Sequence, residues 1–243
     1  MSKKKIVILI SIFLVVAALG CFFVPRILLH MSIRTFLSNC VPGEFVTDFT
    51  GREQNTFTVS NDYYSVEIPE GYTKKEGTES LNVSLYETTE SDRTYLLFDY
   101  GTDMTMSLLE EQWYEEDENL KQVNIKRLEK AFNKLGYGIP DSYYDVQKAI
   151  VLLKEEDYSF WDIDKQLIFF VLGTFKSAWE GEQNVWLYER DDIRAIIRQQ
   201  EGILEGYIID VVHEDDLNTA YGMLIKNAEE TDVWKLLNSW EFH

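Results

Sequence analysis

The chain has 243 residues, with 42 acidic against 23 basic side chains and a formal net charge of −19. Apolar residues make up 45% and charged residues 27%, a balance that excludes both a disordered polyanion and a polytopic membrane protein. Two cysteines exclude a disulfide scaffold and the classical zinc clusters, and the acidic balance argues against nucleic acid as a partner.

A basic tip and a long uncharged stretch open the chain. Residues 1–5 include three lysines, and residues 6–24 are nineteen positions without a charge. At about 1.5 Å per residue, a helix of this length approaches the roughly 30 Å hydrocarbon core of a bilayer. We therefore predict a transmembrane anchor at residues 6–24 in the cell membrane, with residues 1–5 in the cytoplasm and the main domain outside it.

Three fates of this stretch stay open. The run at residues 17–21 resembles a bacterial lipobox, which would make Cys21 a lipidation site after cleavage. A cleaved signal peptide is the other alternative. We favour an uncleaved anchor, because apolar residues continue as far as Leu37.

The segment at residues 25–45 begins with a proline that ends or kinks the anchor helix. Beyond it, Arg26, His30 and Arg34 recur every four residues among apolar side chains. This pattern predicts a juxtamembrane amphipathic segment whose basic stripe suits an anionic headgroup layer. The alternative is that the segment simply extends the anchor.

Residues 46–243 are predicted to form the extracytoplasmic domain. Its first part alternates apolar and polar residues and contains the turn signals Asn61-Asp62 and Pro69-Glu70-Gly71. Alternation with period two is typical of half-buried strands. We predict four antiparallel strands, near residues 57–59, 64–68, 81–85 and 95–100.

The middle of the domain, residues 104–180, changes to a helical period. The spacing predicts helices over residues 125–135, 143–153 and 163–174. Gly136 is the expected stop of the first helix, and the stretches 142–145 and 159–162 are the expected caps of the other two. For residues 167–172, which are all apolar, a buried strand is the alternative.

The last part returns to strands at residues 185–190, 203–213 and 221–225, with a short helix predicted over residues 191–200. A closing helix is predicted to begin at Thr231 or Asp232 and to run toward Trp240. The predicted fold class is therefore α+β: an antiparallel sheet covered by helices, with a helical insertion and one N-terminal transmembrane helix.

Three stretches resemble the PsbP-like/DcrB-like group of small α/β/α domains. They are the hairpin strand at residues 64–72, the strand pair at residues 81–100, and the closing strand and helix at residues 219–240. Similar domains occur in secreted or anchored proteins of Gram-positive bacteria. The resemblance implies an α/β/α domain, and the group has no shared catalytic signature from which functional residues could be transferred.

Few residues are candidates for chemistry. His213 precedes three acids at residues 214–216, which makes it a candidate base. Asp99 and Asp210 lie between apolar neighbours, where burial could raise a carboxyl pKa for glycoside hydrolysis. A strand-end histidine beside a solvated turn and two hydrogen-bonded strand acids are the plainer interpretations. We predict no catalytic set, no cofactor and no metal site.

The strong negative charge and the anchor together favour one class of function. We predict a single-pass, membrane-anchored extracytoplasmic protein that binds a basic protein partner and performs no chemistry, such as an immunity-type or envelope assembly factor. A carboxylate-dependent cell-envelope hydrolase and a ligand-binding lipoprotein are the alternatives.

Overall fold

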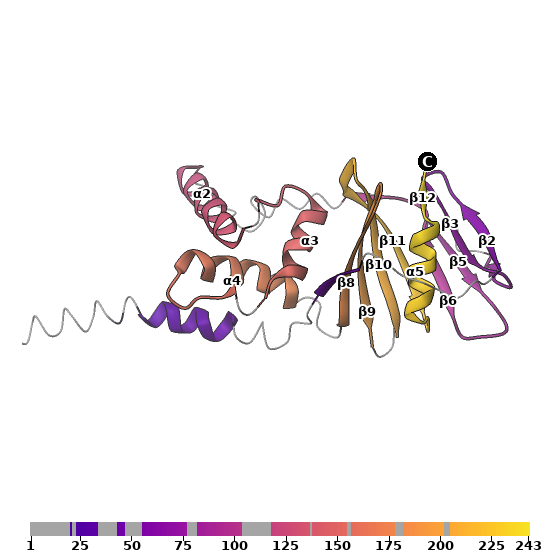
Figure 1. The fold of residues 1–243 in the computed structure, drawn as a ribbon, viewed down its shortest axis with the longest axis horizontal. Helices are drawn as coiled ribbons and strands as arrows, with labels where there is room; N and C mark the ends of the chain where they lie inside the picture. Colours follow the sequence, from indigo (N-terminus) through magenta and orange to yellow (C-terminus); the bar gives the residue numbers. More distant parts are fainter. Residues whose placement is uncertain are drawn as a thin grey trace, which may run out of the picture.

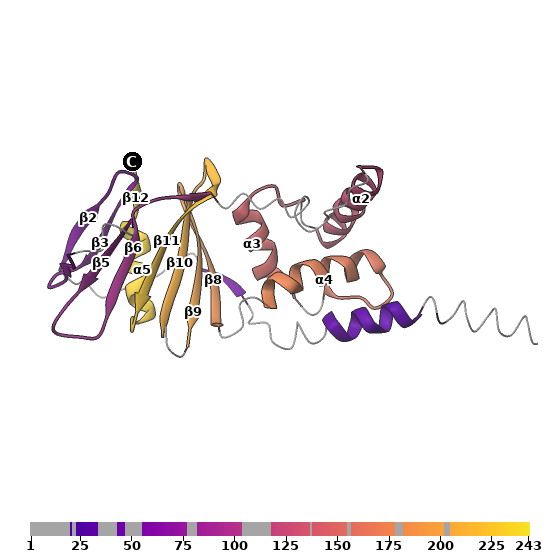
Figure 2. The same ribbon diagram turned by 180° about the vertical axis from the view of Figure 1, so that it is seen from behind.

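The computed structural model describes residues 20, 23–33, 43–46, 55–76, 82–103, 118–136, 138–154, 157–177, 182–201 and 205–243. Over these residues the fold is α+β, with one large mixed sheet, one small antiparallel sheet and helices beside both. The large sheet stands in the middle of the molecule (Figure 1), with the helices at residues 23–33, 118–135, 143–152 and 163–177 on one side and the small sheet on the other. The view from behind shows the same division (Figure 2).

Among the described residues, the large sheet has nine strands. In spatial order they are β1 (Gly43–Val46), β8 (Glu182–Arg190), β9 (Ile193–Gln200), β10 (Gly206–His213), β11 (Asp216–Lys226), β6 (Thr94–Phe98), β5 (Val83–Glu87) and β4 (Thr73–Lys74), while β7 (Thr102–Asp103) pairs with β11. Strand β1 runs parallel to β8 and the other pairs are antiparallel, so the sheet is mixed rather than purely antiparallel. Strand β1 was not predicted from the sequence, because it is too short for a clear alternation.

The small sheet consists of β2 (Thr56–Ser60), β3 (Tyr64–Pro69) and β12 (Glu241–Phe242). Strand β3 buries Val66 and Ile68 while Glu67 stays exposed, as its alternation predicted. The four strands expected in this part of the chain are present as β2, β3, β5 and β6. They divide between two sheets, a detail that a period-two pattern does not specify.

The predicted short helix at residues 191–200 is wrong, because this stretch is strand β9. Ile193 and Ile197 lie in the core on one face of the sheet, and Ile196 lies in a separate core on the other face. Strand β9 is hydrogen-bonded on both edges, to β8 and to β10. A strand buried on both faces loses its alternation, so the isoleucine spacing fits a helix equally well.

Between β7 and β8, the described part of the chain contains three helices: α2 (Glu118–Leu135), α3 (Tyr143–Leu152) and α4 (Ile163–Ser177). Together with residues 23–33 they form a helical block with its own apolar core. Residues 167–172 belong to α4, so the helix rather than the buried strand is confirmed there. The fully buried members of this core include Ile33, Leu128, Phe132, Ile150, Ile168 and Phe169.

Local capping explains where two of these helices begin and end. The Ser142 side chain accepts a hydrogen bond from the amide of Asp145, as predicted for the start of α3. Gly136, just after α2, has a φ of 79°, which suits a helix stop. At α4, Asp162 accepts the amides of Asp164 and Lys165 and is therefore the capping residue, whereas the sequence pointed to a box opened by Ser159.

Helix α3 connects the block to the sheet. Its residues Val146 and Ile150 lie in the core of the helical block, whereas Tyr143, Tyr144 and Val151 pack on the large sheet. Because one helix has apolar residues on two sides, it holds the block against the sheet.

The opposite face of the sheet is covered by the small sheet and by α5 (Glu230–Ser239). Helix α5 begins at Glu230, one or two residues before the predicted start at Thr231 or Asp232, with a capping box formed by Glu229 and Asp232. Trp234 and Trp240 are completely buried in this core. Trp240 stacks on Tyr64, with ring centroids 3.9 Å apart, and thereby joins the end of α5 to β3.

The predicted anchor lies outside the described residues, apart from Gly20, Phe23 and Val24. Within the described ranges, no helix combines the length and the apolar character that crossing a bilayer requires. The helix at residues 23–33 is the first described element, and it packs against the helical block.

Candidate functional site

Two hairpin turns meet at one end of the large sheet. The β8–β9 turn carries Asp191 and Asp192, and the β10–β11 turn carries Glu214 and Asp215. Because both hairpins are antiparallel neighbours in the sheet, their turns lie side by side, and the amide of Glu214 donates to the carbonyl of Asp192 at 2.8 Å. Asp191 has a φ of 42°, a left-handed conformation that aspartate tolerates in tight turns.

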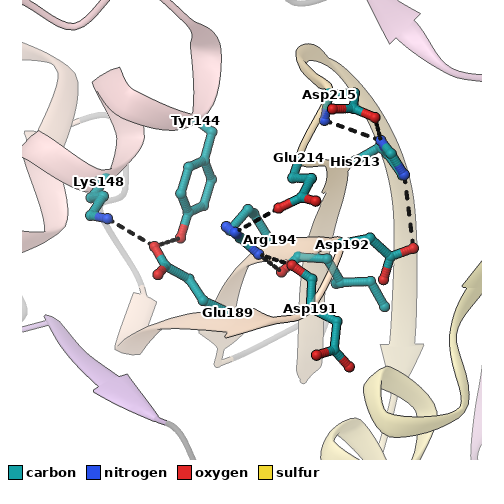
Figure 3. A network of polar contacts seen from close by, with 10 residues as sticks. Tyr144, Lys148, Glu189, Asp191, Asp192, Arg194, His213, Glu214 and Asp215 are labelled. Carbon is teal, nitrogen blue, oxygen red and sulfur yellow. Dashed lines mark hydrogen bonds and ion pairs between the residues drawn. The ribbon is translucent and has the colours of Figure 1, made fainter.

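Arg194 and His213 organise the acids of these turns (Figure 3). The Arg194 guanidinium donates to the carbonyl of Asp191 at 2.8 Å and pairs with Glu214 at 3.1 Å. His213 lies between Asp192 and Asp215, with each ring nitrogen 3.8 Å from a carboxylate oxygen. The turns thus hold more carboxylates than cationic side chains can neutralise.

Beside the turns is a hollow of about 290 Å³, which we call the end pocket. The large sheet and the small sheet both contribute to it. Its lining residues are Tyr63, Asp192, His213, Asp216, Thr219, Tyr221, Phe242 and His243.

Aromatic rings form one wall of the end pocket. Tyr221 lies with its ring centroid 5.7 Å from Tyr63 and 5.5 Å from Phe242. Phe242 also meets the His213 ring edge to face at 5.1 Å. Burial, and then the negative charge of Asp216, raise the pKa of the Tyr221 phenol, so this group stays neutral at physiological pH.

Carboxylates form the rim. Asp192 and Asp216 line the pocket, and the side chain of Asp192 is about half-exposed. Asp215, at 89% exposure, extends the negative surface beyond the opening. A neutral aromatic wall beside exposed carboxylates suits a cationic group carried on an apolar stem, which is the chemistry of lysine and arginine side chains.

A second contact network beside the turns has a structural role. Glu189 accepts hydrogen bonds from Tyr144 at 3.1 Å and from Lys148 at 2.8 Å, and both donors are on α3 (Figure 3). Burial alone would raise the pKa of Glu189, but the hydrogen bond and charge of Lys148 hold that pKa below its ordinary value. These contacts fasten α3 to the end of β8.

The structure places the sequence candidate His213 in the end pocket, but its geometry does not favour a general base. Its Nδ1 accepts the amide hydrogen of Asp215 at 3.1 Å, so the proton of the neutral ring lies on Nε2, toward Asp192. The lone pair that would abstract a proton from a substrate is therefore engaged by the backbone.

The two other candidates lie on opposite faces of the large sheet. Asp99 accepts a hydrogen bond from Ser84 at 2.7 Å, beside the core residues Tyr64 and Leu97. Asp210 faces α3, where it pairs with Arg198 at 2.6 Å. A glycosidase needs two carboxylates about 5–10 Å apart around one substrate. Asp99 and Asp210 cannot provide that arrangement, since the sheet separates them.

One further contact resembles part of a catalytic set. Ser60 Oγ lies 3.1 Å from His243 Nε2, and both side chains are exposed. Nucleophilic catalysis requires a base oriented by a third group and a site that excludes water. An exposed serine–histidine contact at the surface meets neither requirement, so we do not assign it a reaction.

Other predicted features are not brought into this site. Cys21 lies outside the described residues, as does most of the anchor that precedes it. In the described part of the chain, no group of three or more histidine, cysteine, aspartate or glutamate side chains is arranged to hold a metal ion.

Most of the end pocket was not predicted from the sequence. Only His213 was named as a candidate, whereas Tyr63, Asp192, Tyr221 and Phe242 also line the hollow. These residues are far apart in the chain and come together only because β12 pairs with β3 next to the end of β11. The acidic turns were visible as charge runs, but nothing in the sequence distinguished them from other solvated turns.

Comparisons with known proteins give no relative for this chain: no family model, no curated protein and no solved structure matches it. The resemblance to the PsbP-like/DcrB-like group therefore stays a prediction, and we infer the function from the geometry of the end pocket.

Proposed function

We propose that this protein is a non-enzymatic binding module, anchored in the cell membrane by residues 6–24, whose end pocket receives a cationic side chain of a basic protein partner. The main domain stands outside the cytoplasm in this proposal. The observation that carries it is the combination in one hollow of the aromatic wall, Tyr63, Tyr221 and Phe242, with the carboxylates of Asp192 and Asp216.

The binding free energy that such a pocket can contribute is small. A cation over an aromatic ring contributes about 0.5–2 kcal/mol, and an exposed ion pair contributes about 0.2–1 kcal/mol. The pocket is therefore one anchor point within a larger acidic interface. The formal charge of −19 steers a basic partner toward it and accelerates association at low salt.

The anchor supports the same function by restricting the module to the membrane surface. Nineteen uncharged residues at 6–24 are long enough for one crossing, and the acidic remainder of the chain is repelled by an anionic bilayer. An immunity-type factor that masks a basic secreted toxin is one concrete version, and an envelope assembly factor is another. Mass spectrometry of the mature N-terminus distinguishes the intact anchor from a lipidated Cys21.

A peptide titration tests the binding proposal. Full-length protein in detergent is titrated with a fluorescein-labelled hexalysine peptide, as wild type and as the double variant Asp192→Asn, Asp216→Asn. We expect the variant to bind about tenfold more weakly, since it loses about 1.4 kcal/mol of charge attraction at the pocket.

The matched control removes the same amount of charge elsewhere. Glu70 and Glu90 are exposed acids in turns at the other end of the sheets. We expect Glu70→Gln, Glu90→Gln to bind the peptide within about twofold of wild type. Equal weakening in both double variants would mean that the peptide responds to net charge alone, and the end pocket would lose its assignment.

A further inference from the structure

An apolar patch is exposed on the helical block, far from the end pocket. It consists of Val24, Ile27, Leu28, Met31, Trp161 and Ile163, and Trp161 is 70% exposed. The first four residues follow the spacing of one helix face over residues 23–33. Soluble surfaces seldom gather so many large apolar side chains in one place without a binding partner.

The opposite face of the same helix is occupied. Ile33 is buried in the core of the helical block, and Leu29 packs against that core. His30 donates to or accepts from the Tyr158 hydroxyl at 2.7 Å, and the two rings stack at 5.3 Å. The helix is thus docked on the block through one face, so its exposed face is a stable surface.

This arrangement differs from what the sequence suggested. Arg26, His30 and Arg34 were expected to form a basic stripe toward lipid headgroups, and Arg34 lies outside the described residues. The structure instead turns His30 toward Tyr158, and Arg26 lies one turn earlier on the same helix face. The outward face is apolar, and its contact with a bilayer does not require anionic lipid.

Trp161 extends this face beyond the helix. It lies just before α4, and its ring meets Phe23 edge to face with centroids 6.2 Å apart. The Phe160 ring also meets Trp161 edge to face, with centroids 5.0 Å apart. Trp161 is therefore placed beside the first turn of the helix, where the uncharged stretch of residues 6–24 joins the described structure.

We propose that this patch lies on the membrane surface, with Trp161 at the level of the lipid headgroups. The occupant is the bilayer because residues 6–24 end inside the patch, and at about 1.5 Å per residue Met31 is only about 11 Å further along the helix. Tryptophan favours this boundary because its ring is apolar and its N–H is polar.

This orientation deepens the proposed function and rests on its anchor. The helical block becomes the membrane-proximal part of the protein, and the large sheet lies between the block and the small sheet (Figure 1). The end pocket is then held away from the lipid, where a soluble basic partner has access to it.

Fluorescence quenching tests the proposal on the full-length chain. The protein is reconstituted into phosphatidylcholine vesicles, with and without a lipid brominated near the start of its acyl chains. The fluorescence of Trp161 is obtained by subtracting the tryptophan emission of Trp161→Phe from that of the wild type. We expect brominated lipid to reduce this emission at least twofold.

The control places a single added tryptophan beside the large sheet instead of in the patch. Tyr100 is exposed next to β6, so Tyr100→Trp in the Trp161→Phe background adds a tryptophan far from the patch. We expect its added emission to be unaffected by brominated lipid. Trp161 emission that is equally unaffected would overturn the proposal, as would equal quenching of both probes.

Flotation of the same vesicles separates the two proposals. Protein that fails to float with the lipid would overturn the anchor, and the orientation with it. Protein that floats while Trp161 escapes quenching would overturn the orientation alone. Trp161→Phe is expected to leave hexalysine binding unchanged, since the end pocket lies beyond the large sheet.

Discussion

The hydroxyl of Tyr143 donates a hydrogen bond to Asp210 across 3.1 Å, and this bond ties α3 to strand β10. The same carboxylate oxygen pairs with Arg198 at 2.6 Å. Burial, together with the negative charge of Asp210, raises the pKa of Tyr143, so the phenol is a donor throughout the physiological range. Asp210 therefore has a structural explanation that needs no catalysis.

Replacing Asp210 tests that explanation. We expect Asp210→Asn to lower the free energy of unfolding by about 2 kcal/mol, because Arg198 loses a carboxylate in a mostly buried setting. Tyr143→Phe removes only the hydrogen bond from the Tyr143 hydroxyl to Asp210 and is expected to lower the free energy of unfolding by about 1 kcal/mol. Urea denaturation followed by circular dichroism measures both. An Asp210→Asn variant as stable as wild type would contradict the structural role.

Gly206 is expected to be intolerant of any side chain. Its φ is 154°, and a Cβ would lie 2.1 Å from the Ile225 carbonyl oxygen, an atom of the neighbouring strand that cannot move aside. We expect Gly206→Ala to cost about 3 kcal/mol. Gly138 has open space around its Cα, so Gly138→Ala is the control and should change stability by less than about 1 kcal/mol. Similar thermal midpoints for the two variants would refute the predicted clash.

The stacked pair Tyr64 and Trp240 should contribute strongly to stability. Trp240 is fully buried and lies between Tyr64 and Phe242, with ring centroids 3.9 and 5.7 Å away. We expect Trp240→Ala to lower the free energy of unfolding by about 4 kcal/mol, since it leaves a large cavity between α5 and β3. Trp161→Ala, at an exposed position, should cost no more than about 0.5 kcal/mol. Chemical denaturation of both variants decides the comparison.

The ion pairs of Lys134 with Asp162 and Asp164 should stabilise the helical block at neutral pH and lose this effect in acid. Its ammonium lies 2.9 Å from Asp162 and 2.7 Å from Asp164, and hydrogen bonds from Lys134 lower the pKa of both carboxyls below the ordinary value of 3.8. A lowered folded-state pKa stabilises the protein above the unfolded pKa, and that contribution is lost as the pH falls through the folded value. We therefore expect Lys134→Met to lower the melting temperature at about pH 6, and to lower it less as the pH falls below the ordinary carboxyl pKa toward about pH 2.

The control for this pH dependence is on the same helix. Lys126 is exposed on α2, and Lys126→Met should leave the melting curve nearly unchanged at both pH values. If Lys134→Met destabilised the protein equally at both pH values, the effect would come from packing rather than from the carboxylate contacts.

Patterns with a local cause were predictable from the sequence. The alternation around Val66 and Ile68 identified β3, and the Ser142 cap identified the start of α3. Strand β9 was not predictable, because Ile193, Ile196 and Ile197 have the spacing of a helix face. Only pairing on both edges, with β8 and β10, makes the extended form the stable one.

The residues of the candidate site were even harder to predict from local sequence patterns than the strands. His213 stood out because it precedes three acids, and it does lie in the end pocket. Tyr63 and Phe242 could not be identified from the sequence, because neither is near the β8–β9 or the β10–β11 turn along the chain. They reach the pocket through the pairing of β12 with β3, which joins residues that are far apart in the chain.

The acidic charge, the uncharged stretch at residues 6–24 and the α+β class could be predicted without a structure, because they depend on composition and on short-range periodicity. The tertiary structure alone decided which strands share a sheet, which face of the helix at residues 23–33 is exposed, and which rings meet beside the acidic turns. Those outcomes depend on contacts between distant segments, where packing and backbone pairing outweigh the preferences of any single stretch.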